Sequence, residues 1–345
     1  MPDKVGGDSL FIIDISNATV NIQYFITALL HNLGQIGNTI FVISSSWFLL
    51  DSNRVKPAKI YGILGDCFVI SILFLCIFIF AGYEFPFLYI VKNLMPFTFA
   101  CNWFVTCYIL LYMVHPFLNI IIRTIDKRKL LQINLVFAIL YFVIGFLLNN
   151  TAFYFSRIIG FIGIYFITAY VKLYLKKTIL NVKIQCFFCM IGIIGWLLLM
   201  FITNLLGLKT EIFSDQMMRW NIYTNPCFIL IAFSLFNIFK IFDLKSKRIN
   251  SISNLSLLIY VIHCNRIIRD YVRFDIFEYI YTNFTYEYLL LWIILYACVS
   301  FVLAIILAVI YKKTVGKMVK RIGDKIYDFS VSYIEKLLSM MEEME

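Results

Sequence analysis

Long apolar stretches separated by shorter polar gaps dominate the pattern of this chain. A helix needs roughly 17–25 apolar residues to cross a hydrocarbon layer ~30 Å thick, and about nine stretches approach that length. They cover residues 34–50, 60–82, 101–122, 130–148, 152–171, 184–205, 224–242, 252–265 and 288–311. We therefore predict an all-α fold, a polytopic transmembrane bundle of about nine spans.

The two ends of the chain follow different patterns. Residues 1–33 are mixed in polarity, and 22–33 form a short apolar helix candidate that Gly34 and Gly37 interrupt. In the tail, apolar residues recur every three or four positions, at Val319, Ile322, Ile326, Phe329, Tyr333, Leu337 and Met341. This spacing predicts an amphipathic helix that lies along the inner membrane surface. The predicted domains are an extracytoplasmic segment over 1–33, a transmembrane domain over 34–312 and a cytoplasmic tail over 313–345.

Lysine and arginine concentrate in every second gap between these stretches. The rich gaps begin near residues 51, 123, 172 and 240, and the tail that follows residue 311 is also rich. Short loops rich in Lys and Arg stay cytoplasmic, so the C-terminus is predicted inside. An odd number of spans then places Met1 outside. The abundance of Phe, Ile, Asn and Lys is typical of an AT-rich bacterial genome, and we expect the bacterial cytoplasmic (inner) membrane with membrane lipid as a partner.

Composition excludes several classes of function. A hydrophobic content of 62% and a mean hydropathy of +0.87 exclude a soluble globular domain. Membrane topology explains the net charge of +10 better than a nucleic-acid partner does. Cys186 and Cys189 form a CxxC without a second pair or a nearby histidine. We expect no bound metal and no bound cofactor, because no ligand spacing or nucleotide-binding motif occurs.

An ionisable residue inside an apolar stretch is expensive to bury, so each one is a candidate for function. His263 lies near the predicted outer end of the stretch 252–265, and Arg266 and Arg269 follow it at helical spacing. On a continuous helix the three would share one face, where a cationic pocket with an imidazole suits an anionic or hydroxyl-rich substrate. The alternative is a helix-end histidine beside arginines that reach toward the interface. Asn265 belongs to the same segment.

Three further positions carry candidate chemistry. Arg157 in the stretch 152–171 is either a substrate-binding residue or an arginine that reaches toward the interface from a helix end. His31 precedes a polar cluster and is either catalytic or a packing residue. Arg54, Lys56 and Lys59 form a basic cytoplasmic group that follows from topology or also binds a diphosphate-bearing acyl donor.

Four segments, in order, resemble the acyltransferase 3 family of integral membrane O-acyltransferases. Ile36–Leu49 (IGNTIFVISSSWFL) is similar to its "IGVNiFFviSGYFL" helix. Asn102–Tyr112 with Pro116–Asn119 resembles "WFvtaYlilYllsPfLN", and Ile164–Lys172 resembles "lYliGAYirly". Ser256–Asn265 (SLLIYVIHCN) with Arg269 resembles "StfGiYLIHdNplIR". The resemblance covers roughly residues 34–275.

The resemblance implies transfer of an acyl group, most simply acetyl from acetyl-CoA, to a sugar hydroxyl of a cell-surface polysaccharide or a lipid-linked saccharide. His263 is then the candidate catalytic residue, with His31 a weaker one. Trp103, Arg157, Asn265, Arg266 and Arg269 are expected to bind substrate, and Arg54, Lys56 and Lys59 to bind the acyl donor. Family members begin with a helix that carries an arginine and a histidine, and residues 1–33 resemble the loop after that helix instead. We therefore expect the family's first helix to be missing.

Two alternatives remain open at this point. The first is that the chain is such an enzyme, either intact or read from a misplaced start codon. The second is that it is a non-catalytic membrane protein, either a shortened homologue from a degenerate gene or a transporter or flippase of glycan precursors. Transporters typically show internal repeats and broken helices, and the sequence pattern shows neither.

Overall fold

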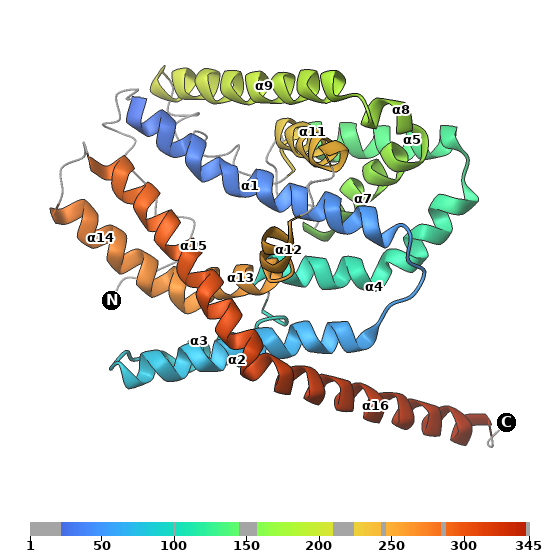
Figure 1. Ribbon diagram of the computed structural model, residues 1–345, viewed down its shortest axis with the longest axis vertical. Helices are drawn as coiled ribbons and strands as arrows, with labels where there is room; N and C mark the ends of the chain where they lie inside the picture. Colours follow the sequence, from blue (N-terminus) through green and yellow to red (C-terminus); the bar gives the residue numbers. More distant parts are fainter. Residues whose placement is uncertain are drawn as a thin grey trace. The chain divides into compact units, whose positions relative to one another are not determined.

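The computed structural model describes residues 22–99, 101–144, 157–209, 224–242, 246–283 and 288–342 (Figure 1). Every regular element within these residues is helical, as the apolar pattern predicts. The chain divides into two compact units, each built from separate parts of the sequence. The described part of unit 1 falls in Val55–Ile109 and Ser246–Glu345, and that of unit 2 in Phe11–Arg54 and Leu110–Lys245.

Unit 1 contains most of the C-terminal helices together with α2 and α3. Its elements are α2 (Pro57–Phe80), α3 (Phe87–Leu94), the start of α4 (Trp103–Thr124), α12 (Lys247–Ser253), α13 (Ser256–His263), the π-helical segment η5 (Ile268–Val272), α14 (Arg273–Asn283), α15 (Leu289–Lys313) and α16 (Val315–Glu342). Its core joins α2, α4, α13, α15 and α16 through Ile70, Ile109, Ile259, Ala308 and Val319. Residues far apart in the sequence thus bury one another.

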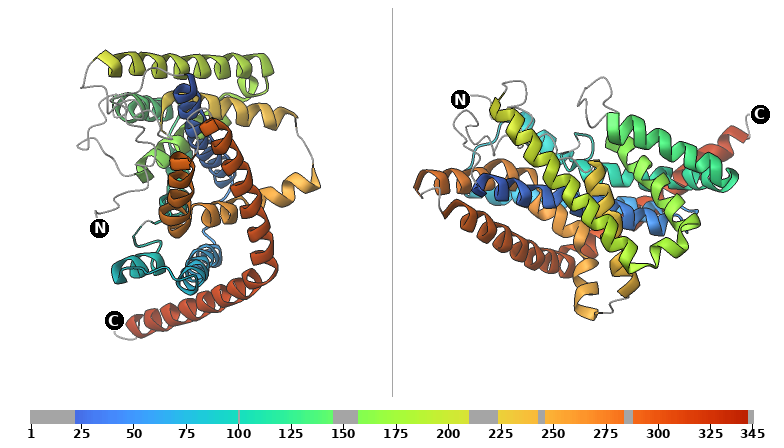
Figure 2. Two further views of the ribbon diagram at one scale, coloured as in Figure 1. Left: turned by 90° about the vertical axis from the view of Figure 1, so that its left-hand side faces the viewer. Right: turned by 90° about the horizontal axis from the view of Figure 1, so that it is seen from above.

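Unit 2 contains α1 and the helices of the middle of the chain. Its elements are α1 (Ile22–Leu49), the rest of α4, α5 (Lys127–Val136), the π-helical segment η3 (Phe137–Ile144), α7 (Arg157–Tyr174), α8 (Lys176–Ile179), α9 (Val182–Lys209) and α11 (Pro226–Phe242). α11 packs on both α9 and α1, and α1 also packs on α7 (Figure 2). The side chains of Phe161, Tyr165 and Phe228 are fully buried in this unit.

Five described helices are long and apolar enough to cross a membrane: α2, α4, α7, α9 and α15. These helices indicate a membrane protein. α11 is apolar but has only 17 residues. The predicted number of about nine spans is therefore not confirmed.

The stretch 252–265 differs most from its prediction. α13 has only eight residues, a length of ~12 Å, which is too short to cross the membrane by itself. The chain turns at Asn254–Leu255 and again at Cys264–Asn265, so the apolar stretch is not one helix. An apolar run alone does not reveal such breaks, because hydropathy reports burial and not backbone hydrogen bonding.

The N-terminal prediction also needs correction. α1 runs without a break through Gly34 and Gly37, and the predicted boundary between residues 33 and 34 falls inside it. A glycine in a helix costs about 1 kcal/mol relative to alanine, which packing of a 28-residue helix readily offsets. The expectation that the family's first helix is missing concerns mainly residues 1–21, which lie outside the described residues.

The tail forms the predicted helix, α16, and packs on α2. A methyl group added at Gly65 of α2 would lie 2.8 Å from Cγ1 of Val319, so the absence of a side chain permits this close approach. Away from α2, the tail exposes an apolar stripe that consists of Met318, Ile322, Ile326, Phe329 and Tyr333. This stripe matches the predicted amphipathic pattern.

Candidate functional site

The candidate site lies in unit 1, where the segment from α13 to η5 meets α3. The turn after α13 is held by Asn265, which is buried and whose Oδ1 accepts the N–H of Ile267 at 3.0 Å. This local bond ends α13 at His263 and starts the next helical segment. The prediction that His263, Arg266 and Arg269 share one face of a continuous helix is therefore wrong. Asn265 instead has a clear structural role in the turn.

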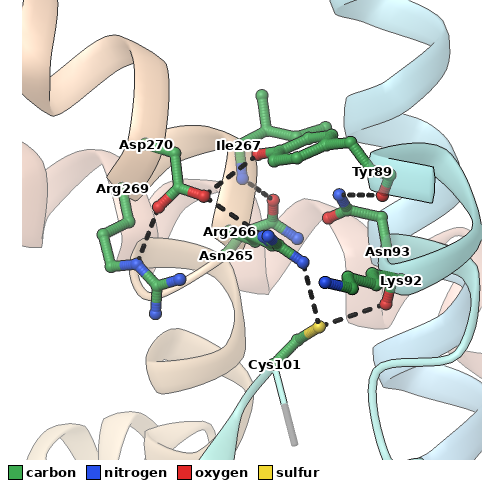
Figure 3. Close-up of polar contacts among 9 residues, drawn as sticks. All are labelled: Tyr89, Lys92, Asn93, Cys101, Asn265, Arg266, Ile267, Arg269 and Asp270. Carbon is green, nitrogen blue, oxygen red and sulfur yellow. Dashed lines mark hydrogen bonds and ion pairs between the residues drawn. The ribbon is translucent and has the colours of Figure 1, made fainter. Parts of the chain in front are cut away.

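Two arginines share one carboxylate in this segment. Nε of Arg266 lies 3.2 Å from Oδ2 of Asp270, and Nε of Arg269 lies 2.9 Å from Oδ1 (Figure 3). Each ion pair is about three-quarters buried. Two guanidinium groups on one carboxylate leave one positive charge in excess. We call Tyr89, Arg266, Arg269 and Asp270 the arginine cluster.

Tyr89 of α3 completes the arginine cluster from a distant part of the sequence. Its hydroxyl donates to Oδ2 of Asp270 at 3.4 Å, and the guanidinium of Arg266 lies 4.5 Å from the centre of its ring. Burial and then the Asp270 carboxylate raise the pKa of Tyr89 well above its usual range. The hydroxyl therefore stays protonated and acts as a donor. Stacking of a guanidinium on an aromatic ring orients the arginine.

Cys101 extends the contacts of Arg266. A nitrogen of Arg266 lies 3.9 Å from Sγ of Cys101, and this thiol donates to the carbonyl oxygen of Lys92 at 3.1 Å (Figure 3). Asn93, which is almost completely buried, donates to the carbonyl oxygen of Tyr89 at 2.9 Å. Side-chain hydrogen bonds thus hold the backbone of α3 beside the arginine cluster.

The imidazole of His263 has a partner at each nitrogen. Nδ1 lies 3.0 Å from the carbonyl oxygen of Ile259, and Nε2 lies 3.2 Å from Sγ of Cys264. Because a carbonyl oxygen only accepts, Nδ1 carries a proton, and whenever the ring is neutral Nε2 presents a lone pair. This tautomer leaves Nε2 able to accept a proton, from the Cys264 thiol or from a hydroxyl that replaces it.

Aromatic rings connect Trp103 to His263. Trp103 makes an edge contact with Phe104 at 5.5 Å, Phe104 contacts Tyr260 at 5.2 Å, and Tyr260 meets the His263 ring at 5.7 Å. Trp103 is half-buried at the first turn of α4. The structure thus joins two predicted site residues from distant segments through two intervening rings.

The sequence pattern did not single out Arg273, Asp270 or Tyr89. Arg273 lies close enough to His263 for its charge to act on the imidazole, and its buried Nε has no hydrogen-bond partner within the described residues. A buried donor without a partner is rare in folded proteins and is suited to hold a ligand. Its position four residues after Arg269 was the only signal in the sequence.

Two other candidates lie in unit 2. Arg157 is exposed at the first described residue of α7. The backbone of His31 belongs to α1, but its side chain is outside the described part of the chain. Both residues thus belong to unit 2, whereas His263 belongs to unit 1.

The basic group at 54–59 is divided between the units. Arg54 is exposed at the end of a unit 2 segment, whereas Lys56 and Lys59 begin unit 1. Lys59 donates to the hydroxyl of Tyr108 at 2.8 Å, and its ammonium also lies 5.4 Å from the centre of that ring. Within unit 1, Lys59 therefore has a structural partner.

Asp66, a carboxylate inside the predicted span 60–82, was not among the predicted site residues. Oδ1 of Asp66 in α2 accepts the hydroxyl of Tyr311 in α15 at 2.9 Å. This bond satisfies part of the hydrogen-bonding capacity of an acidic group in an apolar helix, which would otherwise be expensive to bury.

Comparison with models of known protein families, with curated proteins and with solved structures finds no match. The resemblance of the four segments to the acyltransferase 3 family therefore stays a prediction.

Proposed function

We propose that this chain is a membrane O-acyltransferase, which moves an acyl group from acyl-CoA to a hydroxyl of a surface glycan or its lipid-linked precursor. The observation that carries the proposal is the environment of His263. Its Nδ1 proton is held by a backbone carbonyl, its Nε2 faces a replaceable thiol, and the charge of Arg273 acts on its ring. The order of the four family-like segments supports the same reaction.

In this mechanism a sugar hydroxyl replaces Cys264 at Nε2 of His263. The imidazole accepts the hydroxyl proton while the sugar oxygen attacks the thioester carbonyl carbon of the donor. The guanidinium of Arg273 donates to the oxyanion that forms. The C–S bond then breaks, and the leaving thiolate receives the proton from the imidazolium. The arginine cluster and Trp103 bind the glycan, since guanidinium groups donate to sugar oxygens and an indole packs on the apolar face of a sugar ring.

Measurement of the acyl content of the surface glycan tests this proposal. A strain that lacks the gene is complemented with wild type, His263→Gln or Glu278→Gln, the last being a control on the exposed surface of α14. We expect acylation to fall by about 100-fold or more with His263→Gln, because general base catalysis contributes that much. The control should restore full acylation at equal protein levels. Unchanged acylation on deletion of the gene would contradict the enzyme function.

The broken helix in unit 1 favours one second candidate, a transporter of glycan precursors. Transporters bind substrates where helices are interrupted, and the chain is interrupted on both sides of α13. In that case deletion would lower the amount of surface glycan and leave the acyl content per sugar unchanged. The same strains, analysed for total glycan and for acyl groups separately, distinguish the two functions.

A further inference from the structure

The ends of α1, α7 and α11 meet in unit 2 around one indole ring. Nζ of Lys172 donates to the carbonyl oxygen of Trp47 at 2.6 Å and to Oδ2 of Asp51 at 2.7 Å. The same ammonium lies 4.9 Å from the centre of the Trp47 ring, and that of Lys240 lies 3.5 Å from it. We call Trp47, Asp51, Lys172 and Lys240 the lysine–tryptophan cluster. Two positive charges face one aromatic side chain there.

Buried hydrogen bonds hold this end of α1 in place. The side-chain amide of Asn119 donates to the carbonyl oxygens of Leu49 at 3.0 Å and Ser52 at 2.7 Å. The hydroxyl of Tyr165 donates in turn to Oδ1 of Asn119 at 2.7 Å. Asn119 is 2% exposed, so these bonds are shielded from water. The backbone that carries Trp47 and Asp51 is therefore organised before any ligand binds.

The charges of the lysine–tryptophan cluster are not balanced. Asp51 is its only acidic residue and is 69% exposed, whereas Lys240 makes no ion pair within the described residues. The negative end of a helix dipole favours a lysine near the helix C-terminus, but this effect does not explain why two ammonium groups lie close to the Trp47 ring. The excess positive charge suits an anion.

We propose that the lysine–tryptophan cluster binds a phosphate group of the acyl donor, an inference that rests on the proposed acyl transfer. Ammonium groups bind phosphate as point charges, and Lys240 is an exposed residue. The three helix ends lead into gaps that the lysine and arginine pattern places in the cytoplasm, where acyl-CoA is found. An anionic phospholipid carries the same phosphate chemistry, so the experiment separates a soluble donor from a lipid.

The test measures binding of CoA to the full-length protein in nanodiscs of phosphatidylcholine. Lys240→Gln removes one charge from an exposed side chain, and Lys177→Gln, on the exposed surface of α8, is the matched control. We expect the Kd for CoA to rise about tenfold or more with Lys240→Gln, the loss of a charged hydrogen bond, and to stay unchanged in the control. Lys240→Arg keeps the charge and should retain most of the affinity.

Three outcomes would overturn the inference. The first is that the wild type does not bind CoA, and the second is that Lys240→Gln and wild type have the same Kd for CoA. The third is that Lys240→Gln weakens the binding only of phosphatidylglycerol added to the nanodiscs, and not of CoA. Thermal unfolding of each variant confirms that it is folded; Lys172→Gln is less decisive, because Lys172 also anchors α1. CoA binding that depends on Lys240 without any glycan acylation would support the site and contradict the proposed function. Glycan acylation by a protein in which Lys240→Gln leaves the Kd for CoA unchanged would support the proposed function and contradict the site.

Discussion

The two basic clusters of this protein are built in opposite ways. In unit 1, the two arginines and their carboxylate come from five consecutive residues, Arg266 to Asp270, and the two guanidinium groups share this one carboxylate. In unit 2, Trp47, Lys172 and Lys240 come from three distant helices, and positive charge remains in excess. A locally built cluster depends on its own turn, whereas one built from distant helices depends on the packing of the whole unit.

If unit 2 depends on hydrogen bonds between residues distant in the sequence, substitution of Asn119 should have the largest effect on the free energy of unfolding. Asn119→Leu removes the hydrogen bonds of the Asn119 amide to the carbonyls of Leu49 and Ser52 and to the Tyr165 hydroxyl. Within the described residues only the Leu49 carbonyl keeps another partner, the N–H of Ser52, and we expect a loss of about 3 kcal/mol in the free energy of unfolding. Thermal unfolding in detergent measures it. Asn134→Leu is the matched control, because the buried side chain of Asn134 has no hydrogen-bond partner within the described residues. That control should be neutral or stabilising, and equal destabilisation by both changes would show that the polar bonds do not matter.

If the arginine cluster of unit 1 depends on its shared carboxylate, Asp270→Asn should have the next largest effect on the free energy of unfolding. The change leaves two guanidinium groups close together without a shared carboxylate, and we expect a destabilisation of about 2 kcal/mol. If the arginine cluster binds the glycan as proposed, the affinity for the glycan should fall as well. Asp275→Asn tests the same chemistry at an exposed position, where the carboxylate has a 3.5 Å contact with the hydroxyl of Tyr83, and should unfold like wild type. A similar drop in both melting temperatures would indicate a general effect of charge.

The smallest effect on stability is expected at the apolar contact between α2 and α16 in unit 1, which depends on shape and not on charge. Gly65→Ala would place a methyl group 2.8 Å from Val319, and the shift of α16 that relieves the clash should cost about 1 kcal/mol. Limited proteolysis of the tail measures how firmly α16 stays on α2. Gly62→Ala is the control in the same helix, since a methyl group there meets nothing within 4 Å. Equal cleavage rates for the two variants would contradict a close contact at Gly65.

Much of the fold could be predicted because neighbouring residues encode it. The length and composition of α2, α4, α7, α9 and α15 are properties of single segments, and so is the apolar stripe of α16. The breaks at Asn254–Leu255 and Cys264–Asn265 could not be read from hydropathy, because they depend on local backbone and side-chain hydrogen bonds, such as that of Asn265 Oδ1 with the N–H of Ile267. For the candidate site, the sequence pointed to His263, Arg266 and Arg269 but did not reveal their partners Ile259, Tyr89 and Asp270.

The sequence by itself determined that this protein is helical and membrane-embedded, and which of its side chains carry charge. Hydrophobic length and periodicity suffice for this, since a helix satisfies its backbone hydrogen bonds within one segment. Only the tertiary structure brought Tyr89 to Asp270 and two lysines to Trp47. Contacts between such distant residues follow from how helices pack, and the shapes and small residues that decide the packing leave little signal in one segment read alone.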